Sequence, residues 1–197
     1  MPLSLTFCYA NFTLFKGKSM FTLNEGEIID SFQQLLDDLT TLAYGSYLCE
    51  LVDISMVEGE SSRLLFKQLI TVFYLLRNNV GDLETLLRAF EIKLLKLTGY
   101  GLNTDYCVKC RKKITNSNYL SFESYGGICP ECKKSGGRQI SFASFKALSY
   151  LSNLELEKVY RVKLSSEVKN EIEIILQELI LQSYGKKTKS LEILKGL

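Results

Sequence analysis

The period of the hydrophobic positions changes near the start of the chain. Apolar residues alternate with small or polar ones over residues 3–9, continue over 12–15, and resume over 20–23 after the turn-like Lys16-Gly17-Lys18. A period of two on both sides of a glycine is typical of a β-hairpin. The pattern therefore predicts two antiparallel strands near the start.

Beyond residue 23 the apolar spacing becomes helical. Asn24 with Glu27 three residues later has the form of a helix start, and Ile28, Phe32 and Leu35 then recur at helical intervals. We predict further helices over residues 42–54, 62–77, 82–97 and 165–183, and one that Ser141 opens with Phe142, Phe145, Leu148 and Leu151 on its core stripe. A short strand is predicted over residues 119–122. These patterns indicate a mostly α-helical protein.

Four of the six cysteines stand in two C-x-x-C pairs, and the chain has no histidine. The pairs are Cys107/Cys110 and Cys129/Cys132, separated by the 18 residues from 111 to 128. This spacing is typical of a four-thiolate zinc ribbon, because each short pair can direct both sulfurs to one ion. Zinc is the leading candidate, and rubredoxin-like iron and a disulfide or redox pair are the alternatives. A closed shell of four cysteines predicts a structural metal.

The charge is unevenly distributed, although the whole chain carries only +2. Residues 22–105 have a net charge of −7, whereas residues 107–138 have a net charge of +5. Part of the basic charge offsets the −2 of a zinc ion with four thiolates. The excess favours contact with an anion such as phosphate, against the alternative of an ordinary solvated surface. The candidate DNA-binding residues are Lys109, Arg111, Lys112, Lys113, Lys133, Lys134 and Arg138, together with Lys16 and Lys18 at the hairpin turn.

The composition, 46% hydrophobic and 23% charged, is that of a folded protein and argues against disorder. The sequence contains neither a membrane span nor a signal peptide, so we expect a cytoplasmic location and no membrane partner. In a reducing compartment Cys8 and Cys49 are expected to be buried hydrophobic residues rather than a disulfide. Phosphate-binding glycine motifs and a histidine base are both missing, so we expect no enzyme.

Several motifs in order resemble the bacterial recombination mediator family RecO. They are Asp30-Ser31-Phe32, Leu36-x-Asp38-Leu39, Ala43-Tyr44-x-x-Tyr47-x-x-Glu50-Leu51, Leu86-Leu87-Arg88-Ala89-Phe90-Glu91-x-Lys93-Leu94-Leu95, Thr98-Gly99-Tyr100, Gly127-Ile128-Cys129-Pro130-x-Cys132 and Lys189-Ser190-Leu191. The resemblance covers nearly the whole chain. It implies a protein of DNA repair and homologous recombination that binds single-stranded and duplex DNA and anneals strands. It also implies partners: RecR, the C-terminal tail of the single-strand binding protein and, indirectly, RecA recombinase. The resemblance implies further that the cytoplasm is bacterial and the protein nucleoid-associated.

The resemblance also implies a five-stranded OB barrel before the helical domain, but only about two strands fit here, so the chain looks truncated at its N-terminus. We therefore expect a partial OB-fold fragment (1–23), a helical domain in two parts (24–105 and 139–197) and a zinc ribbon inserted between them (106–138). Two functional interpretations remain at this point. One is a mediator that binds DNA, and the other is a protein-interaction adaptor whose zinc ribbon is purely structural.

Overall fold

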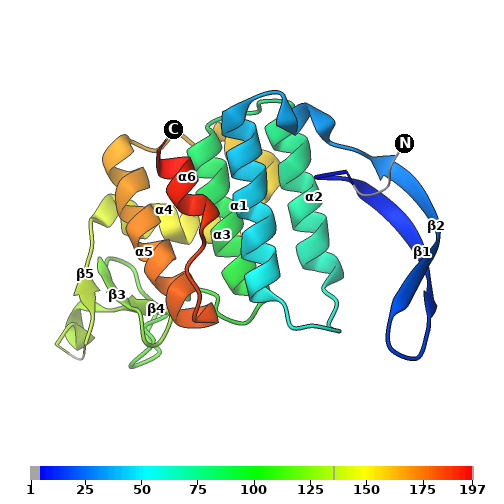
Figure 1. Cartoon of the computed structure of the whole chain (residues 1–197). Coiled ribbons are helices and arrows are strands. Elements are labelled where there is room, and N and C mark those ends of the chain that lie inside the picture. The colour runs from blue at the N-terminus through cyan, green and yellow to red at the C-terminus, as the bar shows by residue number, and fades with distance from the viewer. Residues whose placement is uncertain (1–4, 135, 197) are drawn as a thin grey trace.

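Helix α3 (Leu83–Leu97) lies at the centre of a helical body in the computed structural model, which describes residues 5–134 and 136–196. It packs against α2 (Arg63–Arg77), α4 (Phe142–Asn153) and α5 (Ser166–Tyr184), while α1 (Leu39–Ser55) packs against α2, α3 and the short α6 (Ser190–Lys195) (Figure 1). Ten of the fifteen residues of α3 are buried. One central helix thus joins the segments before and after the cysteines in a common core.

Four of the predicted helix starts are confirmed by side-chain caps, whereas the helix expected from residue 42 begins at Leu39, after Asp38 as its cap. Ser62, Asp82, Ser141 and Ser165 each accept a hydrogen bond from the backbone N–H three residues later. Such bonds satisfy amide groups that the first helical turn leaves free. At the other end of α5, Gly185 adopts a φ of 67°, a conformation that favours glycine and ends the helix.

The helix expected from Asn24 is wrong. Residues Phe21–Asp30 form strand β2, which pairs antiparallel with β1 (Tyr9–Lys16), and only a short 3-10 helix, η1 (Gln33–Leu36), precedes α1. Pairing with β1 gives the backbone of this segment its hydrogen bonds, and this tertiary partner outweighs a local capping pattern. The apolar residues Phe32 and Leu35 are nevertheless fully buried, as their spacing suggested.

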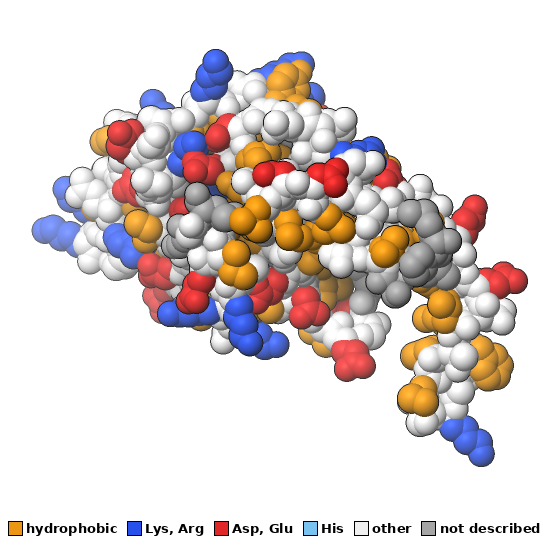
Figure 2. Space-filling view, turned by 45° about the horizontal axis from the view of Figure 1, so that its top comes forward, with side chains coloured by type: hydrophobic (Ala, Val, Ile, Leu, Met, Phe, Trp, Pro, Cys, Tyr) orange, Lys and Arg blue, Asp and Glu red, His pale blue; other side chains and the backbone are white. Residues whose placement is uncertain are grey.

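The predicted hairpin is confirmed, with its turn at Gly17, whose N–H donates to the Met20 carbonyl. Its first strand begins at Tyr9, and the expected strand residues 3 and 4 lie outside the described part of the chain. Because β2 runs to Asp30, the expected boundary between residues 23 and 24 falls inside a strand. The hairpin projects away from the helices, and several large hydrophobic side chains are exposed along it (Figures 1 and 2).

The segment between α3 and α4 contains a second small sheet at the opposite end of the molecule (Figure 1). Its antiparallel strands are β3 (Tyr119–Ser121), β4 (Gly126–Ile128) and β5 (Arg138–Gln139), in the order β4-β3-β5, and a 3-10 turn, η2 (Pro130–Cys132), follows β4. A further 3-10 helix, η3 (Leu156–Arg161), follows α4. The expected fold class is confirmed: a mostly helical protein with an inserted four-cysteine segment and a β fragment before it. None of the helices within the described residues combines the length and apolar character of a membrane span.

Candidate metal centre and its basic surface

The two cysteine pairs meet at one point. The sulfurs of Cys107, Cys110, Cys129 and Cys132 all lie within 4.8 Å of one another, and 3.6 Å separates those of Cys110 and Cys129. Four thiolates around a zinc ion at about 2.3 Å in a tetrahedron are about 3.8 Å apart. The arrangement therefore fits a single tetrahedral metal ion. It does not fit a disulfide, whose sulfurs lie about 2.05 Å apart.

Backbone groups around the cysteines favour thiolates. Burial by itself would raise the pKa of Cys107, but the N–H groups of Cys129, Cys110 and Lys109 donate to its sulfur and lower that pKa to about 6. Hydrogen bonding with the sulfurs of Cys110 and Cys129 is the main reason that the pKa of Cys132 is raised to about 12. A cation among the four sulfurs opposes this second effect, because metal coordination deprotonates a thiol. The donor set thus suits a thiolate-binding ion.

Two glycines let the first cysteine pair approach the sheet. A β-carbon on Gly126 would lie 2.4 Å from the Asn103 carbonyl oxygen, and one on Gly127 would lie 2.6 Å from Ile114. The backbones are joined here, because Gly127 donates to the Asn103 carbonyl at 2.7 Å and accepts from Val108 at 3.0 Å. The second pair follows directly from β4. The Gly-Gly sequence before Cys129 is therefore what allows both pairs to meet.

The two remaining cysteines, Cys8 and Cys49, form no disulfide, as expected, but both are half-buried rather than buried. Burial raises the pKa of Cys49 to about 11, which keeps it a neutral thiol. All six cysteines are free of disulfides.

All seven candidate cations of the cysteine segment are exposed, but they are not equivalent. Lys112 forms an ion pair with Glu131 at 2.6 Å and so connects the two cysteine pairs. Arg138 lies over the ring of Phe122 at 3.7 Å and pairs with Glu178 on α5 at 2.8 Å. Within the described residues the other five have no ion-pair partner: Lys109, Arg111, Lys113, Lys133 and Lys134. The structure does not bring Lys16 and Lys18 near them, because the hairpin turn lies at the far end of the molecule (Figure 1).

Three of the four aromatic residues among these cations belong to the packing rather than to the surface. Tyr119 packs in the small core beneath the cysteines, while Phe122 and Tyr125 pack against the helical core. The hydroxyl of Tyr125 also lies 3.0 Å from that of Ser183 on α5. Tyr106 differs from them because half of its surface is exposed.

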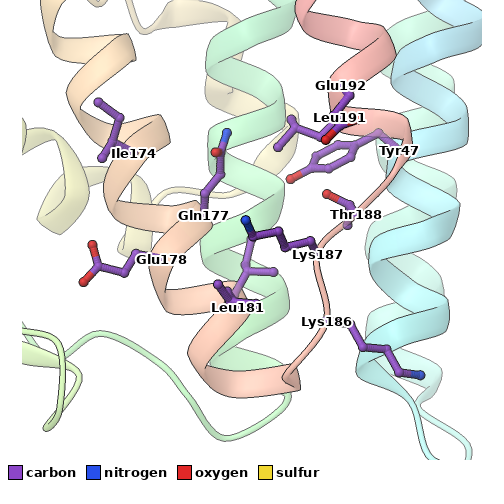
Figure 3. A pocket seen from close by; sticks show the side chains of 11 residues that line it. Tyr47, Ile174, Gln177, Glu178, Leu181, Lys186, Lys187, Thr188, Leu191 and Glu192 are labelled. Carbon is purple, nitrogen blue, oxygen red and sulfur yellow. The ribbon is translucent and has the colours of Figure 1, made fainter.

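Sequence reasoning missed a pocket of about 400 Å³ between α5 and the segment that leads into α6. Leu181 and Ile174 come from α5, Leu191 from α6, and Lys187 reaches across from the connecting segment, whereas Lys186 points away (Figure 3). The connecting segment is held in place because Glu50 accepts backbone hydrogen bonds from Lys189 and Ser190 at 2.8 and 2.9 Å. No local sequence signal reveals this pocket, since it forms only where the segment after α5 runs back along that helix and beside Tyr47 of α1.

A buried polar network lies beside this pocket. In the sequence its residues stood out only as members of the motifs that carry the family resemblance. The Tyr47 hydroxyl donates to Glu91 at 2.6 Å, and Arg88 pairs with Glu91 at 3.0 Å. Burial raises the pKa of Glu91, and the Arg88 charge opposes that rise. Two charged residues three positions apart inside an otherwise apolar stretch were the signal for such a network, because buried charges need partners.

Comparisons with known proteins agree with this architecture. The family model "Recombination protein O C terminal" matches residues 36–192. The protein named DNA repair protein RecO from Clostridium acetobutylicum is 58% identical over 98% of this chain and 78% of its own length. The one from Clostridium kluyveri is 53% identical over 98% and 76%, and the one from Acetivibrio thermocellus is 29% identical over 96% and 76%. The chain belongs to the RecO family, and its role lies in DNA repair and recombination.

Proposed function

We propose that this member of the RecO family is a recombination mediator without catalysis of its own. In this proposal it binds single-stranded and duplex DNA, promotes strand annealing, and acts with RecR to load RecA recombinase in the bacterial cytoplasm. The supporting observation is the group of five exposed cations around the cysteine pairs that have no ion-pair partner among the described residues. Cations that face solvent can neutralise phosphates without reading base sequence, which is what a mediator on arbitrary DNA requires.

We further propose that Cys107, Cys110, Cys129 and Cys132 hold one zinc ion per chain. Four thiolates leave no coordination position for water or substrate, so zinc would supply a structural cross-link between the two cysteine pairs. Its role would be to fix the positions of the neighbouring cations. Metal analysis distinguishes zinc from iron, and ferric thiolate is also red whereas zinc is colourless.

The test of DNA binding reverses two of these five cations. The double variant Lys133→Glu/Lys134→Glu should bind fluorescent single-stranded and duplex oligonucleotides more weakly than the unmodified chain. The slope of log affinity against log salt on single strands should fall by about 0.7 for each phosphate that the variant no longer neutralises. Lys67→Glu/Lys163→Glu is the matched control, because both lysines are exposed and lie outside the cysteine segment. Equal weakening by the two double variants would refute a localised DNA surface.

A second candidate function, protein adaptor, is favoured by the pocket of Figure 3. Its lining combines apolar side chains with the cation of Lys187 and the carboxylates of Glu178 and Glu192, so a hydrophobic peptide with an acidic group placed at Lys187 would suit it. We propose the tail of the single-strand binding protein as its ligand. Ile174→Glu should weaken binding of a synthetic tail peptide, and Ile193→Glu should not, because Ile193 is equally exposed but lies outside the pocket. Unchanged peptide affinity in the first variant would exclude this pocket.

A further inference from the structure

A groove of about 340 Å³ lies between α4 and the chain that carries the first cysteine pair. One wall is α4, and the other is formed by residues 104–105 and 114–117. Hydroxyl and amide side chains are frequent in the lining, among them Thr115, Asn116 and Ser149. The groove is therefore lined by a mixture of polar and apolar side chains, unlike a purely apolar socket.

The rim of this groove on α4 has a regular pattern. Phe142, Lys146 and Tyr150 line it at intervals of four residues, which places all three on one face of the helix. Phe142 was expected in the core, but it is 48% exposed, and Tyr150 is 57% exposed. The core face of α4 is supplied instead by Phe145, Leu148 and Leu151, so the helix packs without Phe142.

These two rings are not stacked on other side chains of the described residues. Within that part of the chain, no aromatic or cation–π contact involves Phe142 or Tyr150. Two large apolar rings exposed to water on one face are unfavourable in free energy, and this is relieved when another molecule covers them. The lysine between them offers a positive charge beside two flat apolar surfaces.

The groove is continuous with the basic surface of the first cysteine pair. Its wall residue Ile114 donates to the Asp105 carbonyl at 2.8 Å, and the adjoining Tyr106 and Lys113 face each other as a bridge pair. Tyr106 is a third half-exposed ring. The Asp105 carboxylate offsets Lys146 within the groove, so the attraction for phosphate comes from the neighbouring cations of the cysteine pair.

The chemistry of this surface fits single-stranded nucleic acid. Aromatic rings that alternate with cations stack on unpaired bases while the cations follow the phosphates. Phe142 and Tyr150 are about 12 Å apart along the helix axis, so the two rings serve different bases of one strand. A duplex cannot use them, because its bases are stacked on one another inside the helix.

We propose that the groove between α4 and the first cysteine pair binds single-stranded DNA, with bases stacking on Phe142 and Tyr150 and the phosphates against the neighbouring cations of the cysteine pair. This inference rests on the proposed DNA-binding function and adds to it a site and a preference for unpaired bases. It also separates two contributions: the rings recognise bases, and the cations around the cysteines bind phosphates.

The test titrates the full chain with two fluorescent single strands of equal length and charge, one of thymidine nucleotides and one abasic. The unmodified chain should bind the thymidine strand more tightly. The double variant Phe142→Ala/Tyr150→Ala should lose at least about fivefold in affinity for it, and almost nothing for the abasic strand. Its salt slope should not change, because no charge is removed. Phe142→Tyr/Tyr150→Phe should retain full affinity, since both rings remain.

Tyr160→Ala is the matched control, because Tyr160 is similarly exposed but lies on η3, outside the groove. If the double alanine variant binds the thymidine strand as the unmodified chain does, the inference is overturned and the groove is left to a protein partner. Equal affinity of the unmodified chain for both strands also overturns it, while the proposed function survives through phosphate contacts. If the unmodified chain binds neither strand, DNA binding itself fails, and this inference fails with it.

Discussion

The molecule has two small β regions, and they are built in opposite ways. The three-stranded sheet of the cysteine segment is held to the helices by Phe122 and Tyr125, and four sulfurs that could hold a metal ion meet at its end. The β1–β2 hairpin has two strands, and most of its large hydrophobic side chains are exposed, with Phe15 at 68% and Met20 at 76%. The first region creates its own small core, and the second has none among the residues that the structure describes.

This difference shows what a short β segment needs in order to be stable. An isolated two-stranded hairpin is only marginally stable in water, whereas a third strand or packing on a helix gives a sheet something to bury. The cysteine segment has both of these and a site for a metal. The hairpin has an anchor at its base, where Asp30 pairs with Arg77 on α2 at 2.7 Å. Its unpaired edges and exposed apolar surface favour association with another chain.

Loss of the proposed metal should have the largest effect on structure. The metal would be a cross-link within the cysteine segment, and the hairpin has no such cross-link. In small finger peptides structural zinc contributes on the order of 10–16 kcal/mol. We expect Cys129→Ser to lose the bound metal and to make residues 107–138 sensitive to protease, while the helical circular dichroism remains. Cys8→Ser is the control, since Cys8 lies outside the site. An unchanged metal content in Cys129→Ser would contradict the assignment of the ligands.

The helical starts and the cysteine site could be predicted from sequence because their signals are local. Ser62, Asp82 and Ser165 stand just before segments whose apolar residues recur at helical spacing, and two C-x-x-C pairs already limit where a metal can bind. The strand at residues 24–30 could not be predicted, because its partner β1 decides its conformation. The exposure of Phe142 also depends on the fold, since α4 has more apolar residues than its core face can bury.

The next largest effect is expected on the free energy of unfolding. One phenylalanine substitution in the helical body and one in the hairpin allow a direct comparison of the two regions. Phe90 in α3 is fully buried, so Phe90→Ala should lower the free energy of unfolding by about 3–5 kcal/mol. Phe15→Ala in the hairpin should change it by no more than about 0.5 kcal/mol. Urea denaturation followed by circular dichroism measures both. Similar losses in the two variants would mean that Phe15 is buried in solution, for example against a second copy of the chain.

The smallest effect is expected at the anchor of the hairpin. Asp30 accepts hydrogen bonds from the Phe32 N–H at 3.1 Å and from Arg77, whose guanidinium also lies over the rings of Phe32 and Tyr74 at 5.2 and 4.8 Å. Burial alone would raise the pKa of Asp30, but these hydrogen bonds and the charge of Arg77 together lower it below its ordinary value of 3.8. The carboxylate therefore stabilises the fold at neutral pH.

Asp30→Asn should accordingly cost about 1 kcal/mol or less at pH 7, because a partly exposed ion pair is weak. A carboxyl with a lowered folded-state pKa contributes its full stabilisation above the ordinary value and loses it as the pH falls through the folded value. The difference in free energy of unfolding between the unmodified chain and Asp30→Asn should therefore stay constant from pH 7 to about 5 and shrink below 3.8. Urea denaturation midpoints at each pH measure this difference. Asp37→Asn, which removes the same charge from an exposed position that has no ion pair among the described residues, should show no such difference. If the cost of Asp30→Asn does not depend on pH, the anchor acts through packing of Arg77 on the two rings, and the charge of Asp30 is not what holds the hairpin to the body.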